Sequence, residues 1–172
     1  MLHLSMLIIQ TGIFRTFITA WFPHMIEKEM VGYVMGTYGL TECLGSFVLG
    51  NASDRWGCPA MIFLSLALEA VSMASLYAVR SYEPYSFFVT AALLGVPEAG
   101  LNTLLYAILY TSFEKGAAYK FLVSVSIGCG ALLGVITTQA TYSIAVFGMA
   151  AVAAVMFVWL TREIGWKAAP KM

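Results

Sequence analysis

Six apolar stretches follow one another along this chain, joined by short polar connections. An α-helix rises about 1.5 Å per residue, so about twenty residues cross the roughly 30 Å hydrocarbon core of a bilayer. Each stretch is close to that length and therefore predicts one transmembrane helix. The expected spans are Leu4–Phe22, Val31–Gly50, Pro59–Val79, Tyr85–Tyr110, Tyr119–Thr138 and Tyr142–Leu160.

The composition agrees with a lipid bilayer as the solvent. Hydrophobic residues make up 60% of the 172 residues and charged residues only 10%, which is unlike a soluble domain. The connections are too short to hold a domain outside the membrane. We therefore predict an all-α membrane protein with six transmembrane helices, in which residues 1–172 form a single transmembrane domain.

The composition also excludes several functions. Nine Lys and Arg balance nine Asp and Glu without a basic run, so nucleic acid is not an expected partner. The three cysteines are far apart and the two histidines lack neighbours at ligand spacing, so neither a disulfide framework nor a metal site is predicted. Because no catalytic constellation is visible, we expect no enzymatic activity and no cofactor.

The basic residues predict an orientation in the membrane. One side is expected to carry Arg55, Lys115, Lys120, Arg162, Lys167 and Lys171, and the other only Lys28 and Arg80. Basic residues collect on the cytoplasmic side of membrane proteins. Both termini are therefore predicted in the cytoplasm or its organellar equivalent, whichever membrane holds the protein.

Four charged side chains lie near the middle of the first four spans: Arg15, Glu42, Glu69 and Glu98. Each costs roughly 2.5 to 3.5 kcal/mol at the centre of an isolated span, so we expect them to face one another or water, together with Asn102. Two interpretations are open. The network is a midplane site for a cation, a proton or a polar solute, or it is structural, with Arg15 paired to one carboxylate and the others protonated or hydrogen-bonded.

Small residues predict where helices approach each other. Two pairs of glycines stand four residues apart on one helical face, Gly32 with Gly36 and Gly130 with Gly134. Such pairs allow close contact between helices, and we expect packing within this bundle rather than a dimer face. Gly95 and Pro97 predict a kink or break just before Glu98.

The connection after the second span contains a recognisable pattern. Gly50-Asn-Ala-Ser-Asp54-Arg55-Trp-Gly57 resembles the signature of the major facilitator superfamily, between the second and third helices of a six-helix half. The resemblance implies that Gly50 permits close helix approach, that Asp54 caps or pairs across the helix ends, and that Gly57 makes the turn. The basic residues that usually follow are replaced by Cys58 and Pro59, so the motif is incomplete.

A further resemblance covers nearly the whole chain and is carried by four stretches. Gly12-Ile-Phe14-Arg15-Thr-Phe17 is similar to the pattern G-x-E-x-x-F, with Phe14 in place of glutamate. Gly95-Val-Pro-Glu98-Ala99-Gly-Leu-Asn102-Thr103 resembles the pattern G-x-x-D-A-x-x-Q-T-Q, with Glu98 for the aspartate, Asn102 for the first glutamine and Leu104 for the second. Gly32-Tyr33-Val34-Met35 with Gly39, and Phe113-Glu-Lys with Ala117-Ala118-Tyr119, agree in order and spacing. Together these stretches resemble the C-terminal six-helix half of the uncoordinated-ninety-three-like (ion-channel regulatory protein) branch.

The resemblance implies half of a major facilitator fold, built from two inverted three-helix repeats. Members of the branch look like transporters but are best known as regulatory or trafficking partners of membrane proteins. An alternating-access carrier rocks one bundle against another, and one bundle is expected here. The favoured hypothesis is a non-catalytic accessory or regulatory subunit of a membrane protein complex.

Two other hypotheses remain, namely a solute or ion transporter assembled as a homodimer or from two polypeptides, and a fragment of a longer protein. Besides the lipid bilayer, the expected partner is another membrane protein or a second copy of the chain. It is expected to cover the face formed by the first, second, fourth and fifth helices, whereas Glu69 should turn into its own bundle.

Overall fold

The computed structural model describes residues 2–78, 84–112 and 123–132, and several positions between 144 and 158. Apart from the connection at residues 26–30 and the turn at Gly57, every described residue is helical and none lies in a strand. The described part of the chain is therefore all-α, as the sequence predicts.

The helices cover the first four predicted spans. Their bounds are α1 Leu2–Thr16, a π-helix Phe17–Trp21, a 3-10 turn Phe22–Met25, α2 Val31–Trp56, α3 Cys58–Ala78 and α4 Pro84–Ser112. Residues 123–132 form a further helical segment. Most of the sixth predicted span lies outside the described residues, as do Gly134 of the fifth predicted span and Lys115 in the connection before that span.

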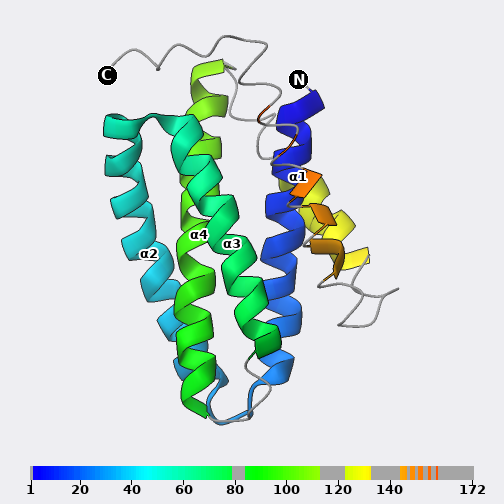
Figure 1. The fold of residues 1–172 in the computed structure, drawn as a ribbon. Coiled ribbons are helices and arrows are strands. Elements are labelled where there is room, and N and C mark those ends of the chain that lie inside the picture. The colour runs from blue at the N-terminus through cyan, green and yellow to red at the C-terminus, as the bar shows by residue number, and fades with distance from the viewer. Residues whose placement is uncertain are drawn as a thin grey trace.

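Successive helices run in opposite directions, so the start of α1, the turn at Gly57 and the end of α4 share one end of the bundle (Figure 1). Among the described residues, two helices are long and apolar enough to cross a membrane, with candidate spans Cys58–Leu76 in α3 and Tyr85–Ile108 in α4. Val123–Leu132 is a shorter apolar helix. The full set of six spans and the inverted repeat stay predictions.

The expected loop after the second span is not a loop. Helix α2 continues through the polar residues that follow Gly50 and ends only at Trp56. It ends there because Gly57 has a φ of 87°, which side chains rarely allow, while its N–H donates to the Ser53 carbonyl and closes the last turn. The predicted span thus stops two turns too early, because hydropathy reports the membrane boundary rather than the helix end.

Helix α4 is the centre of the bundle and packs against both α2 and α3 (Figure 1). The approach of α2 to α4 is close at two glycines. A Cβ at Gly45 would lie 3.0 Å from the Cβ of Ala99, and one at Gly95 would lie 2.7 Å from the Tyr38 carbonyl oxygen and collide with Thr41 Oγ1. Of the kink or break expected before Glu98, the break is absent, because α4 continues through Pro97. Gly95 instead serves helix contact.

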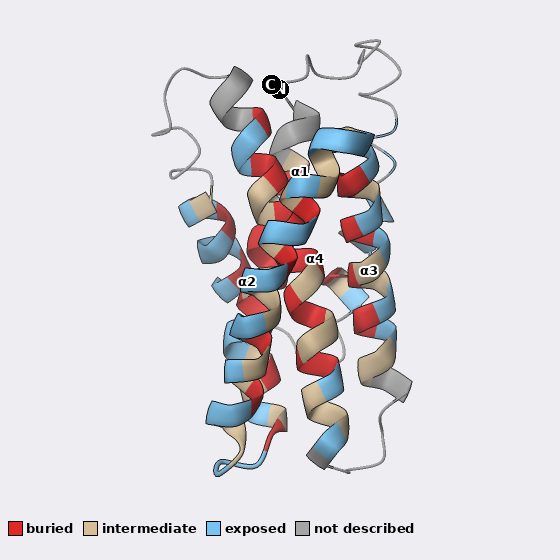
Figure 2. Ribbon diagram, turned by 90° about the vertical axis from the view of Figure 1, so that its left-hand side faces the viewer, coloured by how far each residue is buried: buried red, intermediate tan, exposed pale blue. Residues whose placement is uncertain are grey.

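The predicted role of Gly32 and Gly36 within the bundle is wrong. Both lie on the exposed face of α2, and a Cβ at either position would meet no described atom within 4 Å. Figure 2 shows this exposed outer face along α2. The second predicted pair is half described. Gly130 does pack closely, because its Cβ would stand 2.6 Å from Thr16 Oγ1 of the first helix.

The buried apolar side chains form two clusters along the bundle axis. One cluster contains Ile8 of α1, Leu66 of α3 and Leu101 of α4, and the other contains Ile13, Met73 and Leu94 of the same three helices. The polar side chains Gln10, Glu69 and Glu98 lie between them in each helix. A polar layer therefore separates two apolar layers in the middle of the bundle.

Candidate functional site

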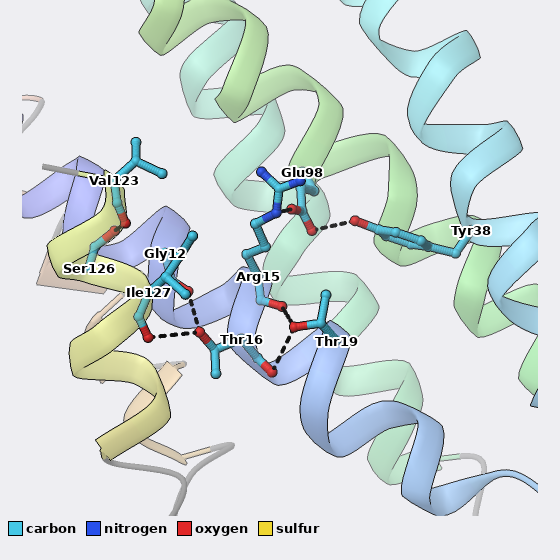
Figure 3. A network of polar contacts seen from close by, with 9 residues as sticks. All are labelled: Gly12, Arg15, Thr16, Thr19, Tyr38, Glu98, Val123, Ser126 and Ile127. Atoms are coloured by element: carbon cyan, nitrogen blue, oxygen red, sulfur yellow. Dashed lines mark hydrogen bonds and ion pairs between the residues drawn. The ribbon is translucent and has the colours of Figure 1, made fainter. Parts of the chain in front are cut away.

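Glu98 is the centre of the polar layer. Its side chain is completely buried on α4, where an ionised carboxylate is costly unless cations or hydrogen-bond donors compensate it. Tyr38 of α2 donates a hydrogen bond from Oη to Glu98 Oε2 at 2.7 Å. Arg15 of α1 places its Nε 3.5 Å from Glu98 Oε1. Figure 3 shows the two partners reaching the carboxylate from opposite sides. Three helices thus converge on one acid.

The predicted ion pair of Arg15 is therefore present, and its partner is Glu98. The Arg15 side chain is 44% exposed although the carboxylate that it contacts is fully buried. The ion pair is not closed by a hydrogen bond, because Glu98 Oε1 makes no hydrogen bond with a described residue. Within the described part of the chain, a guanidinium with unused donors thus stands between the buried acid and the exposed edge of the bundle.

Irregular backbone follows directly after Arg15. The α-helix changes to a π-helix at Phe17, a form that is rare and often found at functional sites. The hydroxyl of Thr19 donates to the Arg15 carbonyl oxygen, and that of Thr16 donates to the Gly12 carbonyl oxygen (Figure 3). Such bonds from a hydroxyl to the preceding turn tend to bend helices. The helix interruption near the site thus lies in the first helix, not at Pro97 in α4.

Glu42 and Asn102 lie at the border of this site. Both are partly exposed, Glu42 one turn after Tyr38 on α2 and Asn102 one turn after Glu98 on α4. The charge of Glu42 acts on both Glu98 and Tyr38. With Arg15 on the other side, the exposed edge of the site presents one positive and one negative side chain.

Glu69 makes no direct contact with Arg15 or Glu98 among the described residues, which agrees with the interpretation in which Arg15 pairs with one carboxylate and another is hydrogen-bonded elsewhere. It is fully buried on α3, as expected from its inward orientation, and accepts a hydrogen bond from Gln10 Nε2 of α1 at 2.5 Å. The same nitrogen donates to the Val146 carbonyl oxygen at 3.3 Å. Glu69 thus has its own hydrogen-bond donor, and only the charge of Glu98 links it to the pair of Arg15 and Glu98.

The residues of the connecting motif have different positions from those implied by the resemblance. Gly50 lies within α2, where a Cβ would make ordinary contact with Thr103 at 3.8 Å, so close approach does not require glycine there. Asp54 and Arg55 are exposed on the last turn, and neither is ion-paired within the described part of the chain. Gly57 does make the turn.

Tyr38 is the residue of this candidate site that the sequence did not reveal. A tyrosine in an apolar helix gives no local signal, because tyrosines are equally common at helix ends and membrane interfaces. The position of Tyr38 along α2 would predict its contact with Glu98 only if the register of α2 against α4 were known. The close contact at Gly95 sets that register, since Gly95 lies against the backbone of Tyr38 and Glu42.

The family model described as Major Facilitator Superfamily matches residues 4–171. The chain belongs to the Major Facilitator Superfamily. No curated protein and no solved structure matches the chain closely enough to count as similar. Membership makes this a transporter-like integral membrane protein. Members of the superfamily are generally transporters rather than enzymes.

Glu98 and Tyr38 lie in the interior of the bundle, and Arg15 reaches Glu98 from a partly exposed position. Glu98, Tyr38 and Arg15 come from three different helices and meet where the two apolar clusters separate. Fold membership alone assigns no solute or partner, so the chemistry of these side chains has to carry any functional argument.

Proposed function

We propose that this chain is a six-helix half of a transporter and that Arg15, held by Glu98, binds a polar solute at the exposed edge of the polar layer. The observation that carries the proposal is the unequal burial of the ion pair, with a buried carboxylate and a 44% exposed guanidinium. In an ion pair with a purely structural role, we expect both partners to be buried and fully hydrogen-bonded, since a buried charge with unused hydrogen-bonding capacity is costly. Here Arg15 keeps donors for a ligand.

The class of solute follows from the charges at that edge. Arg15 offers donors to a carboxylate or phosphate, and Glu42 nearby accepts bonds from a cationic or hydroxyl group. A small solute with an acidic group, with or without an amine, fits this pair. A second bundle would close the site from the outside, as two halves enclose a midplane site in carriers of this kind.

The test is binding of a defined panel to the purified full chain in detergent. Amino acids, small dicarboxylates and neutral sugars are added, and thermal unfolding is followed for each. We expect one acidic class to raise the melting temperature of the wild type and to lose this effect in Arg15→Met. Arg55→Met is the matched control, because Arg55 is exposed at the end of α2. Equal stabilisation of wild type and Arg15→Met would contradict the proposal.

The accessory or regulatory role is the second candidate, and the outer face of α2 favours it. This face exposes Tyr33 and Phe47 by 74% and 73%, together with Leu40 and Leu44. The open glycines Gly32, Gly36 and Gly39 lie on the same helix without described neighbours. Small residues beside large apolar ones are typical of faces where membrane helices associate. The resemblance to the uncoordinated-ninety-three-like branch supports the same role.

Cys43 provides a native probe for this face, because its thiol is exposed on α2. Thiol-directed crosslinking in native membranes, followed by mass spectrometry, distinguishes the occupants. A stoichiometric adduct with a different membrane protein supports the accessory role, and an adduct between two copies supports an assembled carrier. A Cys43→Ser variant is the control. Labelling by a lipid-phase probe alone would contradict both forms of the proposal.

A further inference from the structure

The polar layer contains a second buried pair that the proposed solute site does not use. Glu69 of α3 and Gln10 of α1 are both fully buried, between the two apolar clusters. Gln10 Nε2 donates to Glu69 Oε1 and also to the Val146 carbonyl oxygen. Since a carbonyl oxygen can only accept, this second bond fixes which end of the Gln10 amide is the nitrogen.

The remaining oxygens of the pair lack partners among the described residues. Gln10 Oε1 and Glu69 Oε2 are both buried and make no hydrogen bond with a described residue. Both are acceptors when Glu69 is ionised, so neither can satisfy the other. The hydroxyl of Ser72, one turn along α3, is already bound to the Leu68 and Leu93 carbonyl oxygens. The site therefore has two surplus acceptors.

We propose that Glu69 and Gln10 form a proton-binding site, in which a proton on Glu69 Oε2 is donated to Gln10 Oε1. A carboxylic acid and a primary amide pair through two parallel hydrogen bonds, one in each direction, and one of them is already present. A single added proton thus supplies the missing donor and satisfies both orphaned oxygens. No other atom has to be added.

The charged groups around the site agree with binding of a proton. Gln10 of α1 contacts Glu69, and the backbone carbonyl of Val146 contacts Gln10, and neither group carries a charge. Glu98 of α4 is the charged side chain that acts on Glu69, and it is itself acidic. Arg15, five residues after Gln10, is directed at Glu98 instead. An ionised Glu69 would therefore have a single donor and a like charge nearby.

The proton site is independent of the proposed solute site, because its tests involve no solute. The first test is infrared difference spectroscopy of the purified full chain in detergent, in H₂O and D₂O at neutral pH. We expect the carbonyl band of a protonated carboxylic acid, which disappears in Glu69→Gln and persists in the control Glu42→Gln. Gln10→Leu should shift the band rather than remove it, because the acid loses its hydrogen-bond acceptor.

The second test is the pH dependence of unfolding. Over the pH range in which Glu69 is protonated in the native protein but ionised in the unfolded chain, raising the pH should lower the ratio of folded to unfolded protein about tenfold per pH unit. Glu69→Gln places an amide where the protonated acid stood, so it should fold and lack this slope. Two outcomes of the infrared test would overturn the proposal, namely absence of the carboxylic acid band in the wild type and its persistence in Glu69→Gln. Removal of the band by sodium chloride but not by choline chloride would also overturn it, because the site would then bind sodium in place of a proton.

Discussion

Substitution of Gly95 by alanine tests the packing that brings Tyr38 to Glu98. The added Cβ would collide with Thr41 Oγ1 and lie 2.7 Å from the Tyr38 carbonyl oxygen and 3.0 Å from the Glu42 nitrogen. The hydroxyl can rotate away, but the backbone atoms of α2 cannot move independently. Helix α2 must therefore shift away from α4 as a unit.

The magnitude follows from two opposing effects. Inserting a methyl group into a close-packed contact costs about 1–3 kcal/mol, whereas replacing glycine by alanine inside a helix gains up to about 1 kcal/mol. Because the contact involves backbone, we expect a net loss of about 1–2 kcal/mol in the free energy of unfolding. The shift of α2 also lengthens the 2.7 Å bond between Tyr38 Oη and Glu98 Oε2.

The assay is equilibrium unfolding of the purified protein by titration with SDS in mixed micelles. Gly36→Ala is the matched control, since a Cβ at this helical position meets no described atom within 4 Å, and it should be neutral or stabilising. If Gly95→Ala is as stable as Gly36→Ala, the close contact between α2 and α4 does not exist in the native protein.

Two further substitutions, studied by the same titration, test one hydrogen bond and one backbone conformation. Tyr38→Phe removes the donor to Glu98 and should cost about 1.5–3 kcal/mol, because the bond involves a charged, buried group. Tyr33→Phe, at an exposed position of the same helix, should cost little, and equal losses in the two variants would speak against the bond. Gly57→Ala forces a side chain into a backbone conformation reserved for glycine and should cost about 1–3 kcal/mol. Gly128→Ala in open space is its control, and a harmless Gly57→Ala would mean that the turn has another conformation.

The sequence predicted the course of the chain better than the packing of its helices. Hydropathy placed the first four helices because long apolar segments have few alternatives in a membrane protein. The cost of burying charge likewise predicted that Arg15 would find a carboxylate. Both arguments depend on single segments or single residues and need no knowledge of which helices are neighbours.

The rest depended on three-dimensional register. Gly95 rather than Gly36 mediates helix contact, because the face that α2 turns toward α4 is set by many side chains together. The same register divides the charged residues into two groups, with Glu69 bound to Gln10 and Glu98 bound to Tyr38. Periodicity within one helix cannot decide between such pairings.

The pairing of Arg15 with Glu98 is the central claim, and a double-mutant cycle measures it most directly. Arg15→Met strands the buried carboxylate, and because Arg15 is 44% exposed we expect a loss of about 2–3 kcal/mol, toward the low end for buried pairs. The double variant Arg15→Met with Glu98→Gln removes the stranded charge and keeps an acceptor for Tyr38. It should therefore be more stable than the sum of the two single losses predicts, by about 1–2 kcal/mol. Losses that add to within about 0.5 kcal/mol would contradict the claim.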